Sequence, residues 1–433
     1  MILYSTKNKS HEVSLKEAVI RGLAPDNGLY MPKEIKPLPK QFFETLPQKS
    51  FNAMAFEVAR HLIGNAVSQQ DLAKIVEHTI SFDAPLVEVE TGVYALELFH
   101  GPTLAFKDFG ARFMSQLLGH FAKEEKKEIV ILAATSGDTG SAVANGFLGV
   151  DGTRVVVLYP RGKVSSIQEK QFTTLGKNIT AVEVHGTFDD CQALVKSAFQ
   201  DEELRNEFFL TSANSINIAR LIPQSFYYFY AVSRLMHLKK DIVFAVPSGN
   251  FGNLTGGLLA VKMGLPISHF VVATNKNDVV PEYLRTTKFQ PRPSVQTISN
   301  AMDVGNPSNF DRILALFDND FSKISSMISG YGISDDETRD VMRLVQKHSG
   351  YVLDPHGAVG YAGLKKHLVG KNQVGVFLET AHPAKFVETV EETLATKVKI
   401  PEALQKFMNG QKQAVSLENN FTEFKNMLVR LLR

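Results

Sequence analysis

The stretch Ile129-Val130-Ile131-Leu132-Ala133-Ala134-Thr135-Ser136-Gly137-Asp138-Thr139-Gly140-Ser141 decides the fold class of this chain. It begins with a short apolar run rich in β-branched residues, passes through a glycine-containing turn, and opens a helical pattern over residues 139–148. Such a run predicts a buried strand, and a turn between a strand and a helix is where backbone N–H groups face an anion. The stretch therefore predicts an α/β fold with an anion-binding turn.

The same alternation recurs along the chain. Residues 155–158, 179–184 and 208–210 are short apolar runs that each precede a helical pattern, and a second block follows with strand-like runs at residues 242–246 and 270–273. Short β-branched segments separated by amphipathic helices predict a parallel sheet covered on both faces. We therefore predict an α/β architecture of two parallel-sheet domains plus an N-terminal subdomain.

A chain of 433 residues is too long for one simple core and suggests two or three domains. The predicted division is an N-terminal subdomain over residues 1–83, a small α/β domain over residues 128–238, and a large domain over residues 84–127 and 239–433. The first boundary lies where the pattern switches from helical spacing to period two, near Leu86.

Composition argues against nucleic-acid and membrane partners. The formal net charge of +2 lacks the basic excess of a nucleic-acid binder, and no run approaches the roughly 18 apolar residues of a spanning helix. The first eight residues lack the basic region and long apolar core of a secretory signal. The single cysteine, Cys191, excludes an internal disulfide and a Cys-based metal cluster. We expect a cytoplasmic protein without a metal site.

Two further motifs carry chemistry. His100-Gly101-Pro102-Thr103-Leu104-Ala105-Phe106-Lys107-Asp108-Phe109-Gly110 holds Lys107 among glycine, proline and aromatic residues, just after a predicted strand. Desolvation lowers the pKa of a lysine amine and favours Schiff-base chemistry with an aldehyde. Pro247-Ser248-Gly249-Asn250-Phe251-Gly252-Asn253 is a second turn between a strand and a helix. One lysine and two anion-binding turns suggest pyridoxal phosphate acting on an amino acid.

Each motif taken alone also fits an ordinary structural role. Most lysines near a helix start are simply solvated, and glycine and asparagine are the usual residues of a tight connection such as residues 247–253. Residues 135–139 alone are typical of a helix cap, with Asp138 or Thr139 as the cap residue. The combination of motifs, rather than any one of them, favours the enzyme.

Taken together, the motifs resemble those of the threonine synthases, in the tryptophan-synthase-β-like (fold type II) group of pyridoxal-phosphate enzymes. The match runs through nearly the whole chain and includes Ala24-Pro25-Asp26-Asn27-Gly28-Leu29-Tyr30-Met31-Pro32, Ala301-Met302-Asp303-Val304-Gly305-Asn306-Pro307-Ser308-Asn309 and Glu379-Thr380-Ala381-His382-Pro383-Ala384-Lys385-Phe386. The resemblance implies the fold type II architecture, pyridoxal 5′-phosphate as cofactor, and a monomer. It implies conversion of O-phospho-L-homoserine and water to L-threonine and phosphate by γ-elimination and β-hydration, the last step of threonine biosynthesis.

The resemblance also implies the site residues. Those expected at the cofactor are Lys107, Asp138, Ser248, Gly249, Asn250, Phe251, Gly252, Asn253 and Thr380. Those expected at the substrate are Thr135, Ser136, Gly137, Thr139, Asn214, Ser215 and Arg220. Lys107 would hold the aldehyde and move protons, residues 248–253 would hold the cofactor phosphate, and the Thr380 hydroxyl would face the ring nitrogen. Residues 135–139 would hold the substrate carboxylate and Arg220 its phosphate.

Several points stay open at this level. Many relatives carry Asn where Asp138 stands, and that Asn donates to the cofactor 3′-oxygen, which Asp can do only when it or the ring oxygen carries the proton. The segment 214–217 with Arg220 is also typical of a helix cap with a surface arginine. Lys163 is an alternative phosphate ligand. His356 and His382 lack zinc-site spacing, and we expect them in turns and caps.

Two other functions remain as alternatives. A dehydratase or β-replacement enzyme of the same fold would not need Arg220, because its substrate has no phosphate. A cofactor-binding regulator or an inactive relative should have lost Lys107, which is present in its full sequence context.

Overall fold

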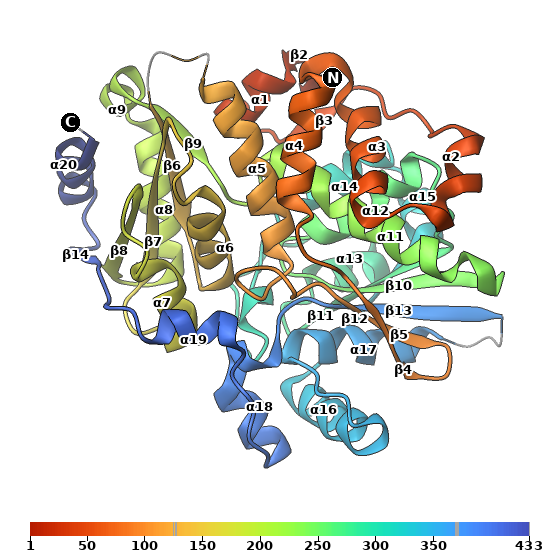
Figure 1. Ribbon diagram of the computed structural model, residues 1–433. Helices are drawn as coiled ribbons and strands as arrows, with labels where there is room; N and C mark the ends of the chain where they lie inside the picture. Colours follow the sequence, from red (N-terminus) through yellow and green to blue (C-terminus); the bar gives the residue numbers. More distant parts are fainter. Residues whose placement is uncertain (124, 126–127, 369–371, 433) are drawn as a thin grey trace.

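A computed structural model describes residues 1–123, 125, 128–368 and 372–432. The described chain contains three sheets, each with its own helices (Figure 1). The expected domain boundary at residues 127/128 touches residues 126–127, which lie outside the described residues.

The N-terminal region is a small antiparallel sheet followed by helices. Its strands, in the order β2-β1-β3, are β1 (Ile2–Ser5), β2 (Asn8–Ser14) and β3 (Tyr30–Pro32). Its helices are α1 (Leu15–Arg21), α2 (Lys40–Thr45), η1 (Leu46–Gln48), α3 (Phe51–Ile63), η2 (Gly64–Ala66) and α4 (Gln69–Thr79). Serines at positions 14, 50 and 68 cap α1, α3 and α4 by accepting from a backbone N–H three residues on, which satisfies a helix-start donor in each.

A six-stranded sheet forms the centre of the large unit. Its strands, in spatial order, are β12 (Ile328–Gly332), β11 (His269–Thr274), β10 (Asp241–Pro247), β13 (Gln373–Glu379), β5 (Val93–Glu97) and β4 (Leu86–Glu90). All neighbours pair in parallel except β4, which runs antiparallel to β5 at the edge. This confirms the mostly parallel sheet predicted from the apolar runs.

Helices cover both faces of this sheet, because alternate residues of each buried strand point to opposite faces. Phe244 of β10 packs on the face covered by α11 and α12, whereas Val243 packs on the face covered by α16, α17 and α18. The helices of this unit are α11 (Phe226–Leu235), α12 (Gly252–Lys262), α13 (Val279–Thr286), α14 (Phe310–Leu316), α15 (Phe321–Met327), α16 (Asp335–Ser349), α17 (Pro355–His367) and α18 (Val387–Leu394), with short turns η3 (Ile222–Ser225), η4 (Met236–Leu238), η5 (Asn300–Met302) and η6 (Pro383–Phe386).

A five-stranded sheet, parallel throughout, forms the small unit. Its strands, in spatial order, are β14 (Val415–Glu418), β8 (Ile179–His185), β7 (Thr153–Pro160), β6 (Ile129–Ala134) and β9 (Phe209–Ser212). Its helices are α5 (Lys107–Ala122), α6 (Asp138–Phe147), α7 (Ser166–Thr173), α8 (Phe188–Gln200), α9 (Glu202–Glu207), α10 (Ile218–Leu221), α19 (Glu402–Met408) and α20 (Phe421–Leu432). Ile131 faces the core shared with α5 and α6, and Leu132 faces α8 and α20.

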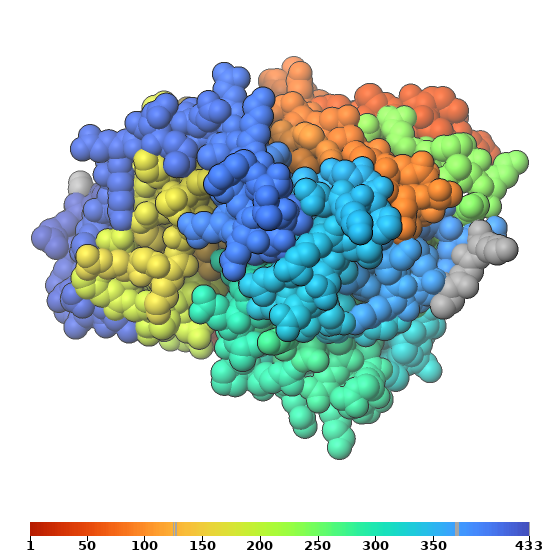
Figure 2. Space-filling view, turned by 90° about the horizontal axis from the view of Figure 1, so that it is seen from below, coloured from red at the N-terminus to blue at the C-terminus, as the bar shows by residue number. Residues whose placement is uncertain are grey.

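The expected assignment of residues 239–433 to the large unit is wrong at its C-terminal end. Strand β14 pairs with β8, and Phe424 and Leu428 of α20 pack on the small sheet with α8. Figure 2 shows the blue C-terminal residues lying against both the yellow small unit and the cyan part of the large unit. The chain therefore returns to the small unit after completing the large one.

The expected small domain over residues 128–238 also ends too late. Tyr228 of α11 packs edge-on against Phe244 and Phe270 of the large sheet, and Phe226 lies in the same central cluster. Within the aromatic run at residues 226–230, the Tyr228 ring is therefore core of the large unit. The rings of Phe226 and Tyr227 instead pack edge-on against Phe113 and Phe109 of α5.

Among the described residues no helix is long and apolar enough to cross a membrane.

Candidate active site

The predicted site residues follow the carboxyl ends of parallel strands from both sheets. Residues 135–137 follow β6, residues 248–251 follow β10, and Thr380 follows β13. The lysine loop follows β5, and Asn214 follows β9. Ligands of open α/β sheets bind outside the carboxyl ends of their strands, so this arrangement brings the separate motifs to one place.

The lysine loop is bonded to the segment that follows β13. Phe106 N–H donates to the Thr380 carbonyl at 2.8 Å, and His382 N–H donates to the Leu104 carbonyl at 3.0 Å, around an isolated antiparallel bridge between Ala105 and Ala381. Leu104 adopts φ 56°, a left-handed conformation that is uncommon for a non-glycine residue. The surrounding bonds therefore hold Lys107 beside Thr380.

Lys107 is the first residue of α5 and is partly exposed within the site. Desolvation by the surrounding protein, together with the charges of Lys385 and Arg220, lowers the pKa of its amine to about 8 against the opposing charge of Asp138. A lowered pKa raises the fraction of neutral amine, the form that attacks an aldehyde. The local chemistry therefore fits an imine-forming lysine.

The turn after β6 presents free backbone donors. The Thr135 hydroxyl oxygen accepts from Gly137 N–H at 2.9 Å and from Gly140 N–H at 2.8 Å, which folds the turn around this side chain. Gly137 has φ 142°, and a Cβ there would lie 2.5 Å from the Gln168 side chain, so only glycine fits. Within the described residues the N–H groups of Ser136, Asp138 and Thr139 have no acceptor. They can bind a carboxylate at the start of α6.

The turn after β10 is a second set of free donors. The N–H groups of residues 249–252 have no acceptor within the described chain, and they stand at the start of the eleven-residue helix α12. Phe251 adopts φ 62°, and Asn253 fastens the turn by donating to the Pro247 carbonyl at 2.8 Å and accepting from the Ser248 hydroxyl at 3.1 Å. A Cβ on Gly249 would lie 2.8 Å from Met302 Cα. The close packing and the free N–H groups fit a phosphate.

The candidate substrate-phosphate residues lie next to this turn. The side-chain Nδ2 of Asn250 donates to the Ser215 hydroxyl, and its side-chain Oδ1 accepts from Ser308 N–H at 2.7 Å. Arg220 is only 4% exposed, and Ala213 accepts from its Nη1, while its Nε is buried without a partner. The buried Asn214 Oδ1 is also unpaired. Burial lowers the pKa of Arg220 to about 10, so it remains a cation with unused donors.

Asn217 takes the helix-cap role that the segment 214–217 also allowed. This residue caps α10 by accepting from Ala219 N–H at 3.0 Å and donates to the Val19 carbonyl at 2.9 Å, which ties the segment to α1. Its side chain is therefore committed to the fold. Arg220 is not the surface arginine of the ordinary interpretation, because it is buried.

Sequence reasoning missed Arg312. Its side chain is fully buried in α14 and donates to the carbonyls of Ser215 at 3.1 Å and Ile216 at 2.6 Å. These hydrogen bonds therefore hold in place the loop that contains the candidate phosphate-binding residues. Burial lowers the pKa of Arg312 to about 9. A single arginine in a helical pattern carries no signal of burial, so only tertiary packing reveals it.

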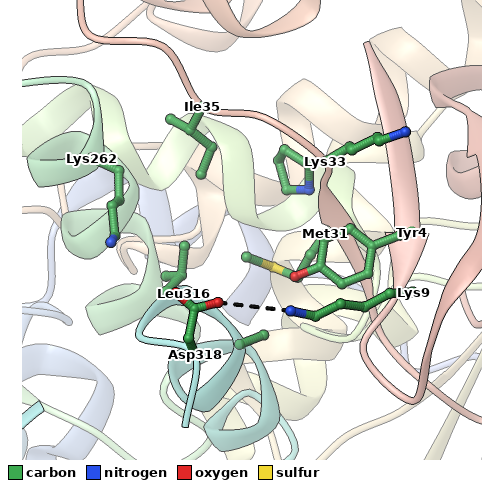
Figure 3. A pocket seen from close by; sticks show the side chains of 10 residues that line it. Tyr4, Lys9, Met31, Lys33, Ile35, Lys262, Leu316 and Asp318 are labelled. Atoms are coloured by element: carbon green, nitrogen blue, oxygen red, sulfur yellow. Dashed lines mark ion pairs between the residues drawn. The ribbon is translucent and has the colours of Figure 1, made fainter. Parts of the chain in front are cut away.

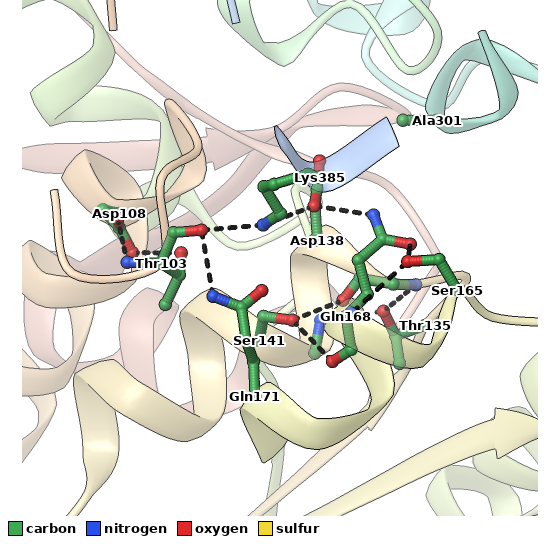
Figure 4. A network of polar contacts seen from close by, with 12 residues as sticks. Thr103, Asp108, Thr135, Asp138, Ser141, Ser165, Gln168, Gln171, Ala301 and Lys385 are labelled. Carbon is green, nitrogen blue, oxygen red and sulfur yellow. Dashed lines mark hydrogen bonds and ion pairs between the residues drawn. The ribbon is translucent and has the colours of Figure 1, made fainter. Parts of the chain in front are cut away.

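Sequence reasoning also missed Lys385, which Figure 4 shows at the centre of a buried polar network. Its Nζ lies 2.6 Å from Asp138 Oδ1 and donates to the Thr103 carbonyl at 2.8 Å. Gln168 Nε2 donates to the same Asp138 oxygen at 2.8 Å. Burial alone would raise the pKa of Asp138, but the charges of Lys385 and Lys107 hold it well below its usual range. Asp138 is therefore an ionised acceptor and cannot donate to a ring oxygen.

The remaining candidates have ordinary partners. His382 caps η6 by accepting from Ala384 N–H at 3.0 Å, and His356 bonds to Asp354 and accepts from Ala301 N–H. His382 is thus a cap residue, as predicted, whereas His356 lies in the first turn of α17, which Asp354 caps. Lys163 is exposed. No group of three or more possible metal ligands occurs among the residues that the structure describes.

Two hollows differ in their relation to the site. A cleft of about 1450 Å³ between the N-terminal region and the small unit reaches Ala134, Asn214, Asn250 and Ser308. A smaller hollow of about 320 Å³ lies beside β3 and α14, with Lys9, Lys33 and Lys262 around it and no predicted site residue in its lining (Figure 3). Of these two hollows, the larger one reaches residues of the candidate site.

Pyridoxal phosphate fits these residues. It needs an amine for its aldehyde, donors for its phosphate and a partner for its ring nitrogen, and the chain brings together Lys107, the free N–H groups of residues 249–252 and the buried Thr380.

Comparison with known proteins agrees with this geometry. The model of the pyridoxal-phosphate-dependent enzymes matches residues 78–379, that of the threonine synthase N terminus matches residues 3–80, and that of the threonine synthase C-terminal region matches residues 357–428. The chain is 46% identical to the threonine synthase of Haemophilus influenzae over 99% of this chain and 100% of that protein.

Solved structures give the same result. The crystal structure of threonine synthase from Escherichia coli superposes with a TM-score of 0.94 at 42% identity, over the full length of both chains. The structure of threonine synthase with bound pyridoxal phosphate from Brucella melitensis superposes with a TM-score of 0.94 at 33% identity, also over both full chains.

Fold and site thus define a pyridoxal-phosphate-dependent enzyme of the fold type II architecture, a carbon–oxygen lyase. Within that class the chain belongs to the threonine synthase family. The predicted fold class, cofactor and enzyme function are confirmed.

Proposed function

We propose that the residues described above convert O-phospho-L-homoserine and water to L-threonine and phosphate. The observation that carries this proposal is the position of Arg220, which is buried, has unused donors, and lies near enough to Lys107 for its charge to lower the pKa of that amine. An amino acid held at Lys107 with a phosphate on its Cγ would meet a cation there. A substrate without a phosphate would leave Arg220 buried and unpaired, which is unfavourable.

Each anion of the reaction has a proposed set of donors. The N–H groups of Ser136, Asp138 and Thr139 take the α-carboxylate, and Asn214, Ser215 and Arg220 take the substrate phosphate. The N–H groups of residues 249–252 take the cofactor phosphate, and the Thr380 hydroxyl faces the ring nitrogen. Because a hydroxyl does not protonate that nitrogen fully, this partner favours elimination and replacement over transamination.

When bound, pyridoxal phosphate withdraws electrons from the α-carbon of the amino acid. Lys107, with a pKa of about 8, can accept the proton from Cα and carry protons at Cβ and Cγ. The Cγ–O bond breaks with its electrons on the departing phosphate, and Arg220 stabilises that charge. Water then adds its oxygen at Cβ, so one substrate and one water give one threonine and one phosphate.

The test is a product analysis of the purified protein with O-phospho-L-homoserine. We expect threonine and phosphate in equal amounts. In parallel incubations with L-serine and L-threonine, 2-oxo acid and ammonia would instead identify a dehydratase. Absence of turnover with every substrate, despite a Schiff-base band that borohydride removes, would point to an inactive relative.

The proposal also covers the cellular location and the oligomeric state of the enzyme. We place it in the cytoplasm and expect a monomer, in keeping with a lone cysteine, Cys191, that is buried and unpaired. Light scattering of the purified protein tests the monomer, and fractionation of its cells tests the location.

A further inference from the structure

Lys385 is a buried lysine for which the reaction outlined above has no role. It is 1% exposed and comes from η6, just after the strand that positions Thr380. A lysine ammonium has three N–H donors. One goes to Asp138 Oδ1 at 2.6 Å and one to the Thr103 carbonyl at 2.8 Å (Figure 4). Within the described residues the third has no acceptor.

The surroundings of Lys385 show which ligand atoms its third donor can reach. The titratable groups that interact electrostatically with Lys385 are Asp138 of α6, Lys107 and Asp108 of α5, and the neighbouring His382. Asp138 interacts with both Lys385 and Lys107, so the two amines share one carboxylate. An aldehyde carbon bound to Lys107 therefore lies close to Lys385. On pyridoxal phosphate the ring carbon beside the aldehyde carries an oxygen, which is the nearest anionic atom.

We propose that Lys385 is a second cofactor-contacting lysine, whose third N–H donates to the ring oxygen beside the aldehyde, while Asp138 and Thr103 hold its ammonium in place. This inference rests on the proposed role of Lys107. The ion pair spans the two sheet units, because Asp138 belongs to the small unit and Lys385 to the large one. It therefore also fixes the carboxylate-binding turn relative to the lysine loop.

The contact has a chemical consequence. One proton is shared between the ring oxygen and the Schiff-base nitrogen, and a cationic donor at the oxygen keeps that oxygen anionic. The shared proton then stays on the nitrogen, which gives the long-wavelength absorption band. Deprotonation of the nitrogen would leave a net negative charge that the Lys385 ammonium stabilises, so loss of Lys385 should let the nitrogen keep its proton to higher pH.

The test uses the holoenzyme without substrate and records its absorption spectrum against pH. In Lys385→Met the pH midpoint of the long-wavelength band should rise by about one unit or more, a tenfold or greater gain in proton affinity. The double variant K385M/D138N removes both charges and supplies an amide donor. Its midpoint should lie between those of K385M and the wild type, because a neutral donor is weaker than a charged one.

Lys425→Met is the matched control. Lys425 pairs with Asp201 at 2.9 Å on the outer side of the small unit, between α20 and α9, so its loss removes an ion pair far from the cofactor. The spectrum and its midpoint should stay those of the wild type. A shift as large as in K385M would assign the effect to general destabilisation and overturn the proposal.

The outcomes separate the two proposals. A wild-type midpoint in K385M, or a change that appears only when substrate is added, overturns the contact with the ring oxygen. If K385M does not fold, K385M/D138N carries the test, and a wild-type midpoint there overturns the contact. Borohydride labelling of the wild type at a lysine other than Lys107 would instead overturn the role of Lys107 in the proposed function.

Discussion

The Thr103 hydroxyl donates to Asp108 Oδ1 at 2.6 Å, and the Thr103 N–H donates to Asp108 Oδ2 at 2.9 Å. These two bonds close the loop that carries Lys107. The loop also packs tightly around the carboxylate, because a Cβ on Gly101 would lie 2.4 Å from Asp108 Oδ2. Asp108 is thus the internal support of the imine-forming lysine, and Thr103 connects that support to Lys385 through its carbonyl.

Replacement of Asp108 by Ala should destabilise the fold. The change leaves two buried donors of Thr103 unpaired, which costs about 1–3 kcal/mol for each such group. Asp108→Asn should be milder, because its amide oxygen still accepts one bond. Urea unfolding of the cofactor-free protein measures both. Asp340→Ala removes an exposed partner of Arg343 and is the control, with an expected change within about 0.5 kcal/mol. Equal losses in the Ala and control variants would contradict the support role.

Lys107→Ala should keep the fold and abolish turnover. The phosphate-binding turn of residues 249–252 is untouched, so cofactor still binds, but no Schiff base forms. Peptide mapping of the wild type after borohydride reduction identifies the modified lysine. Lys385 provides an internal comparison, because it is a buried lysine in the same site. Recovery of the label on Lys385 would reverse the two assignments.

The lowered pKa of Lys107 predicts a pH dependence in the cofactor-free protein. Schiff-base formation needs the neutral amine, so its rate on addition of pyridoxal phosphate should rise with pH and reach half its maximum near pH 8. The pKa falls from 10.5 in the unfolded chain to about 8 in the folded one. Between these values the unfolded chain binds more protons, so stability rises with pH across this window.

The Lys107→Met variant isolates this contribution. Its urea midpoint should lack the part of the rise between about pH 8 and 10.5 that the wild type shows, because the variant has no amine at this position to bind a proton in the unfolded chain. Parallel stability profiles for the two proteins would show that the Lys107 amine titrates alike in the folded and unfolded states.

Local signals in the sequence account for much of the fold. The runs at residues 129–132 and 242–246 form β6 and β10, because β-branched, apolar residues fill the interior of a sheet covered on both faces. The capping box of Ser334 and Glu337 starts α16 with both reciprocal bonds present. By contrast, β14 (Val415–Glu418) is only four residues long, so its alternation of apolar and polar residues is too short to identify a strand. Its pairing with β8 depends on contacts between segments that lie far apart in the sequence.

The candidate site also contains some residues that the sequence predicts and others that it does not. Glycine turns after strands are visible in sequence because the backbone demands them, as at Gly137. Lys385 and Arg312 are not visible, because most lysines and arginines are solvated and their burial depends on partners far along the chain. The partner of Lys385, Asp138, lies in the other sheet unit, and the carbonyls that bind Arg312 belong to the loop after β9.

Thr380→Ala should weaken cofactor binding and slow proton abstraction, whereas Thr380→Ser should be mild because it keeps the hydroxyl. The lost hydrogen bond is worth about 1 kcal/mol net, which corresponds to roughly a fivefold change in the dissociation constant. Equilibrium binding of pyridoxal phosphate and the rate of α-proton exchange measure the two effects. An alanine variant with wild-type affinity and rate would remove Thr380 from the ring nitrogen.

Arg220→Lys tests the substrate phosphate. A guanidinium makes a forked, charge-assisted contact with phosphate that a lysine ammonium cannot reproduce, even though both are cations. Loss of a hydrogen bond to a charged group costs about 1.5–3 kcal/mol, so the dissociation constant of O-phospho-L-homoserine should rise roughly ten- to a hundredfold. The Schiff-base spectrum should be unchanged, because the cofactor phosphate lies in the other turn.

Lys163→Gln removes the exposed lysine that the sequence left as an alternative ligand, and it should leave substrate affinity at the wild-type value. Substrate binding and the absorption spectrum are measured side by side for the three proteins. If substrate binding were weakened in Lys163→Gln and unchanged in Arg220→Lys, the substrate phosphate would not lie at Arg220. If Arg220→Lys lost the Schiff-base band, this arginine would bind the cofactor instead.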